Sequence, residues 1–196
     1  MLSVVPCDSP TSESYQNGYM SDRAATVQDV GDLVSLTAKL EARRGCVRAV
    51  SAIEHYERGL ACEAENEPDA AMAAYRRALA GRPDLADACN NLGRLHHDQD
   101  QFGDAESLYR LAICADAQVG LYWFNLGVVL EDVGRCAEAI KAYERALALE
   151  PTLADAHFNL ARQLEQVGRR GADDLVMRRA VRHLKRYRDL VRTGLG

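Results

Sequence analysis

The sequence predicts an all-α fold, an α-solenoid of about four stacked helix-turn-helix units with a capping helix at each end. Two observations lead to this prediction. Ala and Leu dominate the chain and aromatic residues make up only 6%, a composition that favours helices over strands. Small and aromatic residues also recur with a 34-residue period, and one such hairpin cannot bury its apolar face without stacked neighbours.

The 34-residue period is carried by several independent series of residues. These series are Gly59, Gly93 and Gly127; Tyr75, Tyr109 and Tyr143; Leu92, Leu126 and Leu160; and Ala78, Ala112, Ala146 and Ala180. They place the repeats at about 52–85, 86–119, 120–153 and 154–192.

The third unit shows what each repeated place does physically. Leu126 belongs to the apolar stripe of a first helix. Gly127 lies in the middle of that helix, where a glycine is usually retained because another helix crosses at close range. Gly134 is expected to end the first helix, Tyr143 to pack from the second, and Pro151 to stop the second.

These residues resemble the tetratricopeptide repeat, whose 34-residue pattern places Trp, Leu-Gly, Tyr, Ala, an aromatic residue, Ala and Pro at set positions. The resemblance covers about 52–192 and is strongest in the second and third units. It implies a right-handed superhelix that acts as a protein–protein interaction scaffold, with no enzymatic activity and no cofactor. The chain departs from the pattern at Arg58, at Asp173, and at His55 and His157, which replace the large aromatic residue.

The two ends are predicted to differ from the repeats. Residues 1–24 are rich in Ser, Asp, Thr and Gly and are expected to be a disordered tail, followed by a capping helix and linker over 25–51. After Gly168 the sequence predicts one long, basic, amphipathic helix. Two registers compete there: Met177 and Ala180 keep the 34-residue count, or a seven-residue insertion gives the packing places to Ala180, Leu184 and Tyr187.

A row of asparagines is the main functional signal. Asn91, Asn125 and Asn159 recur with the 34-residue period, so stacking would line them along the concave groove, where an amide can pair with the backbone of an extended peptide. The alternative is that these amides are only solvated. The predicted groove residues are Tyr56, Asn90, Asn91, Arg94, Phe124, Asn125, Val128, Phe158, Asn159 and Arg162. Acidic residues are also expected in the groove and outnumber its two arginines, which favours a peptide with basic and apolar residues. They are Glu57, Asp87, Asp98, Glu131, Asp132, Asp155 and Glu165.

The remaining chemistry is predicted to be structural. No catalytic or metal-binding motif is present, and His55 and His157 are expected to be core histidines, as Cys62 and Cys89 are expected to be small core residues. Adjacent helical side chains point about 100° apart, so His96 and His97 are not expected to chelate a metal together. The six scattered cysteines and the absence of an apolar leader favour a reduced, cytoplasmic protein that does not enter a membrane. The protein is expected to be a monomer or a weak homodimer.

An alternative function is regulation through contact with nucleic acid or an anionic surface. The segment 169–192 holds nine Lys and Arg against three Asp, although the whole chain has a net charge of −5. Phosphates could contact Arg178, Arg179, Arg182, Lys185, Arg186 and Arg188. Because the rest of the chain is acidic, nucleic acid is the less expected partner, and a solvated outer face is the expected state of this helix.

Overall fold

The computed structural model describes residues 51–194. Internal contacts divide the chain into Met1–Arg43 and Arg44–Gly196, and the described residues all belong to the second unit. The predicted tail over 1–24 lies outside the described residues, and so does the predicted capping helix and linker over 25–51, apart from its last residue.

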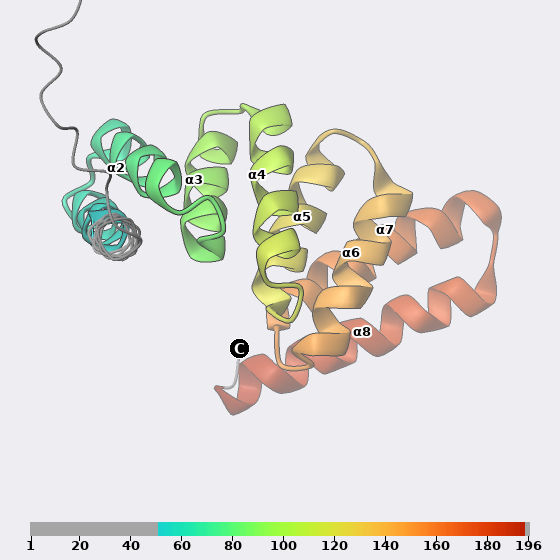
Figure 1. Ribbon diagram of the computed structural model, residues 1–196. Coiled ribbons are helices and arrows are strands. Elements are labelled where there is room, and N and C mark those ends of the chain that lie inside the picture. The colour runs from blue at the N-terminus through green and yellow to red at the C-terminus, as the bar shows by residue number, and fades with distance from the viewer. Residues whose placement is uncertain (1–50, 195–196) are drawn as a thin grey trace, which may run out of the picture. The chain divides into compact units, whose positions relative to one another are not determined.

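Residues 51–194 form four successive helical hairpins (Figure 1). A helix over 51–64 is followed by α2 (Pro68–Gly81), α3 (Ala86–Asp98), α4 (Phe102–Ala115), α5 (Gly120–Asp132), α6 (Cys136–Leu149), α7 (Ala154–Gly171) and α8 (Asp174–Thr193). From α2 onwards each helix packs against the next along the chain, and α3 also contacts α5. The predicted all-α solenoid of about four units is confirmed.

The repeated glycines let two helices approach closely. A Cβ atom added to Gly127 would lie 2.5 Å from the ring of Tyr143, and one added to Gly93 would lie 2.9 Å from the ring of Tyr109. Both tyrosines are buried in the core. The predicted reason for these glycines, a close helix crossing, is therefore confirmed.

The turns inside the first three hairpins share one backbone conformation. Asn66, Asp100 and Gly134 all have positive φ, at 59°, 59° and 78°. They recur with the same 34-residue period, which thus extends from the packing residues to the loops. Only small or polar residues that tolerate the left-handed region stand there.

The fourth hairpin is longer, and its turn corrects the sequence prediction. The next residue in the turn series is Gly168, but α7 continues through it to Gly171. The left-handed turn residue is Ala172, and Asp173 caps α8 by accepting hydrogen bonds from the amides of Leu175 and Val176. Residues 169–171 therefore belong to α7. Gly168 lies inside α7, and Met177 packs against it, 2.8 Å from where a Cβ would lie.

Ring contacts give the register of this hairpin. In the first and third units Tyr56 packs on Tyr75 and Phe124 packs on Tyr143, at the same separation along the chain. In the fourth unit that separation would pair Phe158 with Met177, yet the ring that packs on Phe158 is that of Tyr187. By this ring contact the pairing of the two helices is shifted by ten residues, while Ala180 is buried, as both predicted registers place it.

Within residues 51–194, no helix is both long enough and apolar enough to cross a membrane.

Candidate functional site

The first helices of the hairpins form one continuous surface, here called the first-helix face, made by the 51–64 helix, α3, α5 and α7. Side chains bridge each consecutive pair of these helices. Arg94 pairs with Glu63, Asn125 donates from Nδ2 to Asn90 Oδ1 at 2.8 Å, and Arg162 pairs with Glu131. These contacts involve four of the predicted groove residues, Asn90, Arg94, Asn125 and Arg162.

The asparagine row lies along this face but is largely bonded within it. Asn91 and Asn125 are half-buried, and Asn91 Nδ2 donates to the Tyr75 hydroxyl at 3.5 Å. Asn90 is only 5% exposed; it accepts from Asn125 and donates to Asn91 Oδ1 at 3.3 Å. Asn90 is therefore an internal bridge between α3 and α5. Burial raises the pKa of Tyr143, and a hydrogen bond with Asn159 partly offsets that rise.

The apolar side chains of the first helices, the predicted groove residues and Leu60 among them, differ in exposure. Phe158 is 41% exposed and Leu60 is 42% exposed, whereas Tyr56, Phe124 and Val128 are half-buried. The Tyr56 ring lies 5.8 Å from the Tyr75 ring, and the Phe124 ring lies 5.9 Å from the Tyr143 ring. The aromatic surface open to a ligand is thus largest at α7.

A carboxylate network, which the sequence analysis did not identify, repeats in alternate units. The Tyr75 hydroxyl donates to Glu63 at 2.7 Å, and the Tyr143 hydroxyl donates to Glu131 at 3.0 Å. The equivalent place in the second unit is His97, which bonds Asp132 at 2.6 Å instead. The sequence does contain a signal for this network, because Glu63 and Glu131 are two periods apart, and so are Arg94 and Arg162. A search for residues that recur in every 34-residue unit overlooks it.

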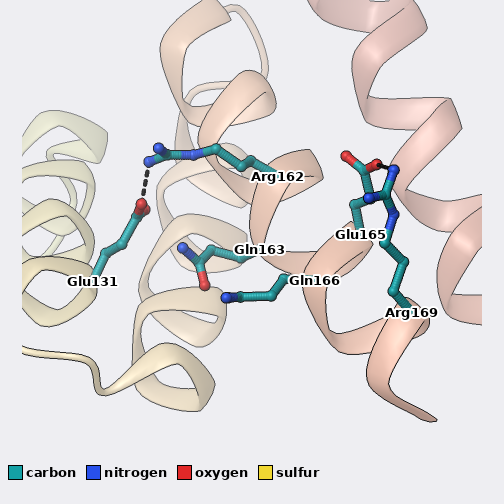
Figure 2. A pocket seen from close by; sticks show the side chains of 6 residues that line it. All are labelled: Glu131, Arg162, Gln163, Glu165, Gln166 and Arg169. Atoms are coloured by element: carbon teal, nitrogen blue, oxygen red, sulfur yellow. Dashed lines mark hydrogen bonds and ion pairs between the residues drawn. The ribbon is translucent and has the colours of Figure 1, made fainter.

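Two cavities open beside these Glu–Arg pairs. One of about 330 Å³ is lined by Glu131, Arg162, Gln163, Glu165, Gln166 and Arg169 (Figure 2). The other, of about 290 Å³, is lined by Glu63, Asn66, Glu67, Pro68, Arg94, Leu95, Asp98 and Gln99. The two lie at matching places two units apart, so the first-helix face presents the same kind of recess twice.

The predicted core places of His157, Cys62 and Cys89 are buried, whereas His55, also predicted to be a core histidine, is only half-buried. His157 is 8% exposed and lies 2.9 Å from His183 between their Nδ1 atoms, while Cys62 and Cys89 are buried. Neighbouring His96 and His97 bond different partners, Gln101 and Asp132. Across residues 51–194, no three His, Cys, Asp or Glu side chains gather as metal ligands would.

The basic face of α8 is open to solvent. The cations singled out from the sequence are all exposed: Arg178, Arg179, Arg182, Lys185, Arg186 and Arg188. Two of them have acidic neighbours, since Arg179 pairs with Glu144 and Arg188 lies 3.8 Å from Asp189.

Comparison with known proteins agrees with the fold. A tetratricopeptide repeat model matches residues 85–115, and a second model, described as a TPR repeat, matches residues 132–168. No curated protein sequence matches the chain.

Solved structures of repeat proteins superpose on the chain. A structure of MamA is 17% identical with a TM-score of 0.65, and the match covers 90% of this chain and 98% of that one. MamA from AMB-1 is 27% identical with a TM-score of 0.58, covering 70% and 72%. The first TPR of Spaghetti (RPAP3), bound to an HSP90 peptide, is 22% identical with a TM-score of 0.59, covering 61% and 95%. Residues 85–115 and 132–168 thus match tetratricopeptide repeat models, in agreement with the 34-residue period and the packed Gly–Tyr pairs.

Proposed function

We propose that the first-helix face binds an extended segment of a partner protein. The observation that carries this proposal is the row of amides at 34-residue intervals, beside exposed apolar side chains and two recesses on the same face. Amides of this kind can exchange an internal partner for a peptide backbone group, because an amide both donates and accepts. Repeat proteins of this family act as interaction modules, and the related RPAP3 repeat is bound to a peptide.

Magnitudes show that the amides cannot act alone. Three or four net hydrogen bonds at about 1 kcal/mol each give at most millimolar binding, whereas micromolar binding needs about 8 kcal/mol. The rest must come from apolar contacts, for which Phe158 and Leu60 offer the most exposed surface. The partner segment is therefore expected to carry apolar residues as well as basic ones that suit the acidic side chains.

The ligand class differs from the HSP90 peptide that RPAP3 holds. Family members that capture the C-terminal carboxylates of heat-shock chaperones use a clamp of Lys and Arg side chains. The corresponding places here are Tyr56, Leu60, Asn91, Leu121 and Asn125, which are apolar or amide. A peptide recognised by its terminal carboxylate is therefore not the expected ligand.

Selection of peptides from a random displayed library, followed by titration of the selected peptides, tests the proposal. Phe158→Ala and Asn159→Ala should each weaken the selected peptides about tenfold. Lys141→Ala is the matched control, since Lys141 is exposed on α6 and lies on a second helix. Unchanged affinity in both face variants would refute binding at this face.

Asn125 is best left unchanged in this experiment. Its amide is the partner of the buried Asn90 oxygen, so an alanine at 125 would leave a buried acceptor unpaired and lower stability. Loss of binding in such a variant could then reflect partial unfolding.

The basic face of α8 is a second candidate site, for nucleic acid, favoured only by its six exposed cations. Phosphate contacts make affinity fall steeply with salt. Titration against random DNA should show no binding at about 150 mM salt, because the rest of the chain is acidic.

A further inference from the structure

One buried side chain on the first-helix face lacks a hydrogen-bond partner. Gln163 on α7 is 5% exposed, and its Oε1 is the single buried side-chain nitrogen or oxygen in residues 51–194 that has no partner. Desolvating an acceptor without replacing its hydrogen bond is costly, and native proteins contain few such atoms. Gln163 therefore needs an explanation other than packing.

The repeat pattern confirms that this place does not require a polar residue. In the second and third units it is filled by Leu95 and Val129, which are 5% and 0% exposed. The fourth unit alone puts an amide into an otherwise apolar place. A leucine would fit there, as Leu95 shows, so the glutamine lowers stability where a stabilising residue was available.

Gln163 lines the 330 Å³ cavity together with other residues that carry acceptor oxygens. Glu131 comes from α5, while Glu165 and Gln166 come from α7. Figure 2 shows the side chains of Gln163 and Gln166 leaving α7 in the same direction, on the side where Glu131 lies. The Gln166 oxygen has only a thiol, Cys136 Sγ at 4.0 Å, as its partner.

The arginines of this cavity are already paired. Arg162 bonds Glu131, and Arg169 lies 2.5 Å from Glu165. The groups of the cavity that remain available are therefore acceptor oxygens, and a ligand that pairs with them must be a hydrogen-bond donor. A carboxylate ligand would leave the Gln163 oxygen unpaired, because both groups can only accept a hydrogen bond.

We propose that this cavity binds the ammonium group of a lysine side chain from the partner segment. An ammonium is compact and carries three donors and a positive charge, so it can donate to the Gln163 oxygen and keep donors for a second acceptor of the cavity. The inference rests on the proposed function, since it names the partner chemistry of the same face. The matching cavity beside Arg94 has Leu95 in place of Gln163 and lacks the unpaired acceptor.

The test uses a small probe, Nα-acetyl-lysine methylamide, titrated into the ¹⁵N-labelled full chain. Nα-acetyl-norleucine methylamide is the control, because it keeps most of the aliphatic chain and lacks the ammonium. The lysine probe should shift the side-chain amide signals of Gln163 and Gln166 at millimolar concentrations, and the norleucine compound should not. Gln163→Leu should weaken the lysine probe at least tenfold while the protein unfolds at a higher urea concentration than the wild type.

Two results would overturn the inference: equal shifts from the norleucine compound, or undiminished lysine binding in Gln163→Leu. A stronger response to glutarate than to the lysine probe would also overturn it, by assigning the cavity to an acidic ligand. Asn159→Ala separates this question from the proposed function, because it should weaken selected peptides but leave the lysine probe unaffected. If library peptides bind but the lysine probe shifts no signal of the protein, the ammonium site is refuted and the proposed function is not.

Discussion

The repeated glycines contribute to the fold because they have no side chain. A glycine inside a helix normally costs about 1 kcal/mol relative to alanine, so Gly127 in the middle of α5 is unfavourable by local propensity. The ring of Tyr143, which is fully buried, fills the space that a methyl group would take. Packing therefore overrides propensity at this place.

A matched pair of alanine variants measures this balance. Gly127→Ala should lower the free energy of unfolding by about 1–3 kcal/mol, because the buried Tyr143 ring must shift. Gly103→Ala should raise it by up to about 1 kcal/mol, since an added Cβ on α4 meets no atom within 4 Å. Urea unfolding of both variants gives the two values. A stabilising Gly127→Ala would contradict the close-crossing explanation.

The residues of the site were only partly predictable from the sequence. Periodicity assigns Asn91, Asn125 and Asn159 to equivalent places on successive first helices, since residues one period apart occupy equivalent places. It could not show that Asn90 is buried as a bridge, or that both arginines are already paired, because side-chain partners depend on rotamers. The unpaired oxygen of Gln163 was missed for the same reason.

At the scale of elements, two histidines join α7 to α8. His157 Nε2 lies 3.2 Å from the Pro151 carbonyl oxygen, and its Nδ1 lies 2.9 Å from His183 Nδ1. One Nδ1 must donate and the other accept, so at least one ring is neutral. Burial is the main cause that lowers the pKa of both rings from the ordinary 6.5. Nearby positive charges lower the pKa further, while the Pro151 carbonyl opposes this change at His157.

This pair predicts a loss of stability in mild acid. Because the folded pKa values lie below the unfolded ones, the unfolded chain binds more protons as pH falls through about 6.5. The contribution of this pair to the free energy of unfolding should therefore be complete above that pH, and the free energy of unfolding should decrease below it. The slope is at most about 1.4 kcal/mol per pH unit for each excess proton. Urea unfolding between pH 8 and pH 5 measures it.

His183→Gln is the control for this pH dependence. It keeps a hydrogen-bonding side chain and removes one titrating ring, so the slope between pH 7 and pH 5 should become shallower. An unchanged slope would assign the acid sensitivity to other groups.

The lengthened fourth hairpin explains where the sequence analysis was least accurate. Helix identity and the four hairpins followed from periodicity, but a glycine at a repeat place does not by itself end a helix. Gly168 lies inside α7 and is the place where Met177 of α8 packs closely. No single break in the pattern marks the ten-residue shift in the pairing of these two helices.

The ring contact of Tyr187 gives a test of this register. Tyr187→Ala should destabilise the protein by about 2–3 kcal/mol, since Tyr187 is half-buried and packs 5.2 Å from the Phe158 ring. Leu184→Ala should cost less than about 1 kcal/mol, because Leu184 is 39% exposed. Urea unfolding ranks the two variants, and the reverse order would favour the seven-residue register.

At the scale of the whole array, contacts run mainly between neighbours along the chain. Stability in such arrays is close to a sum of unit and interface terms, so ends open before the middle. Amide hydrogen exchange should show greatest protection in α5 and α6. Tyr187→Ala should lower protection in α7 and α8 while leaving α3 and α4 close to wild type. A uniform loss over all four hairpins would show that the array unfolds as one unit.

The alternation of Glu–Arg pairs from one unit to the next determines how this array can be lengthened. Copying the hairpin 120–153 alone would set Val128 beside the Glu131 of the preceding copy and leave that carboxylate without its arginine. Copying the double hairpin 86–153 would instead bring Arg94 against Glu131 and keep His97 opposite Asp132. An extended version built from pairs of hairpins should therefore fold with every cross-helix pair intact. The interchangeable module of this protein is two hairpins long.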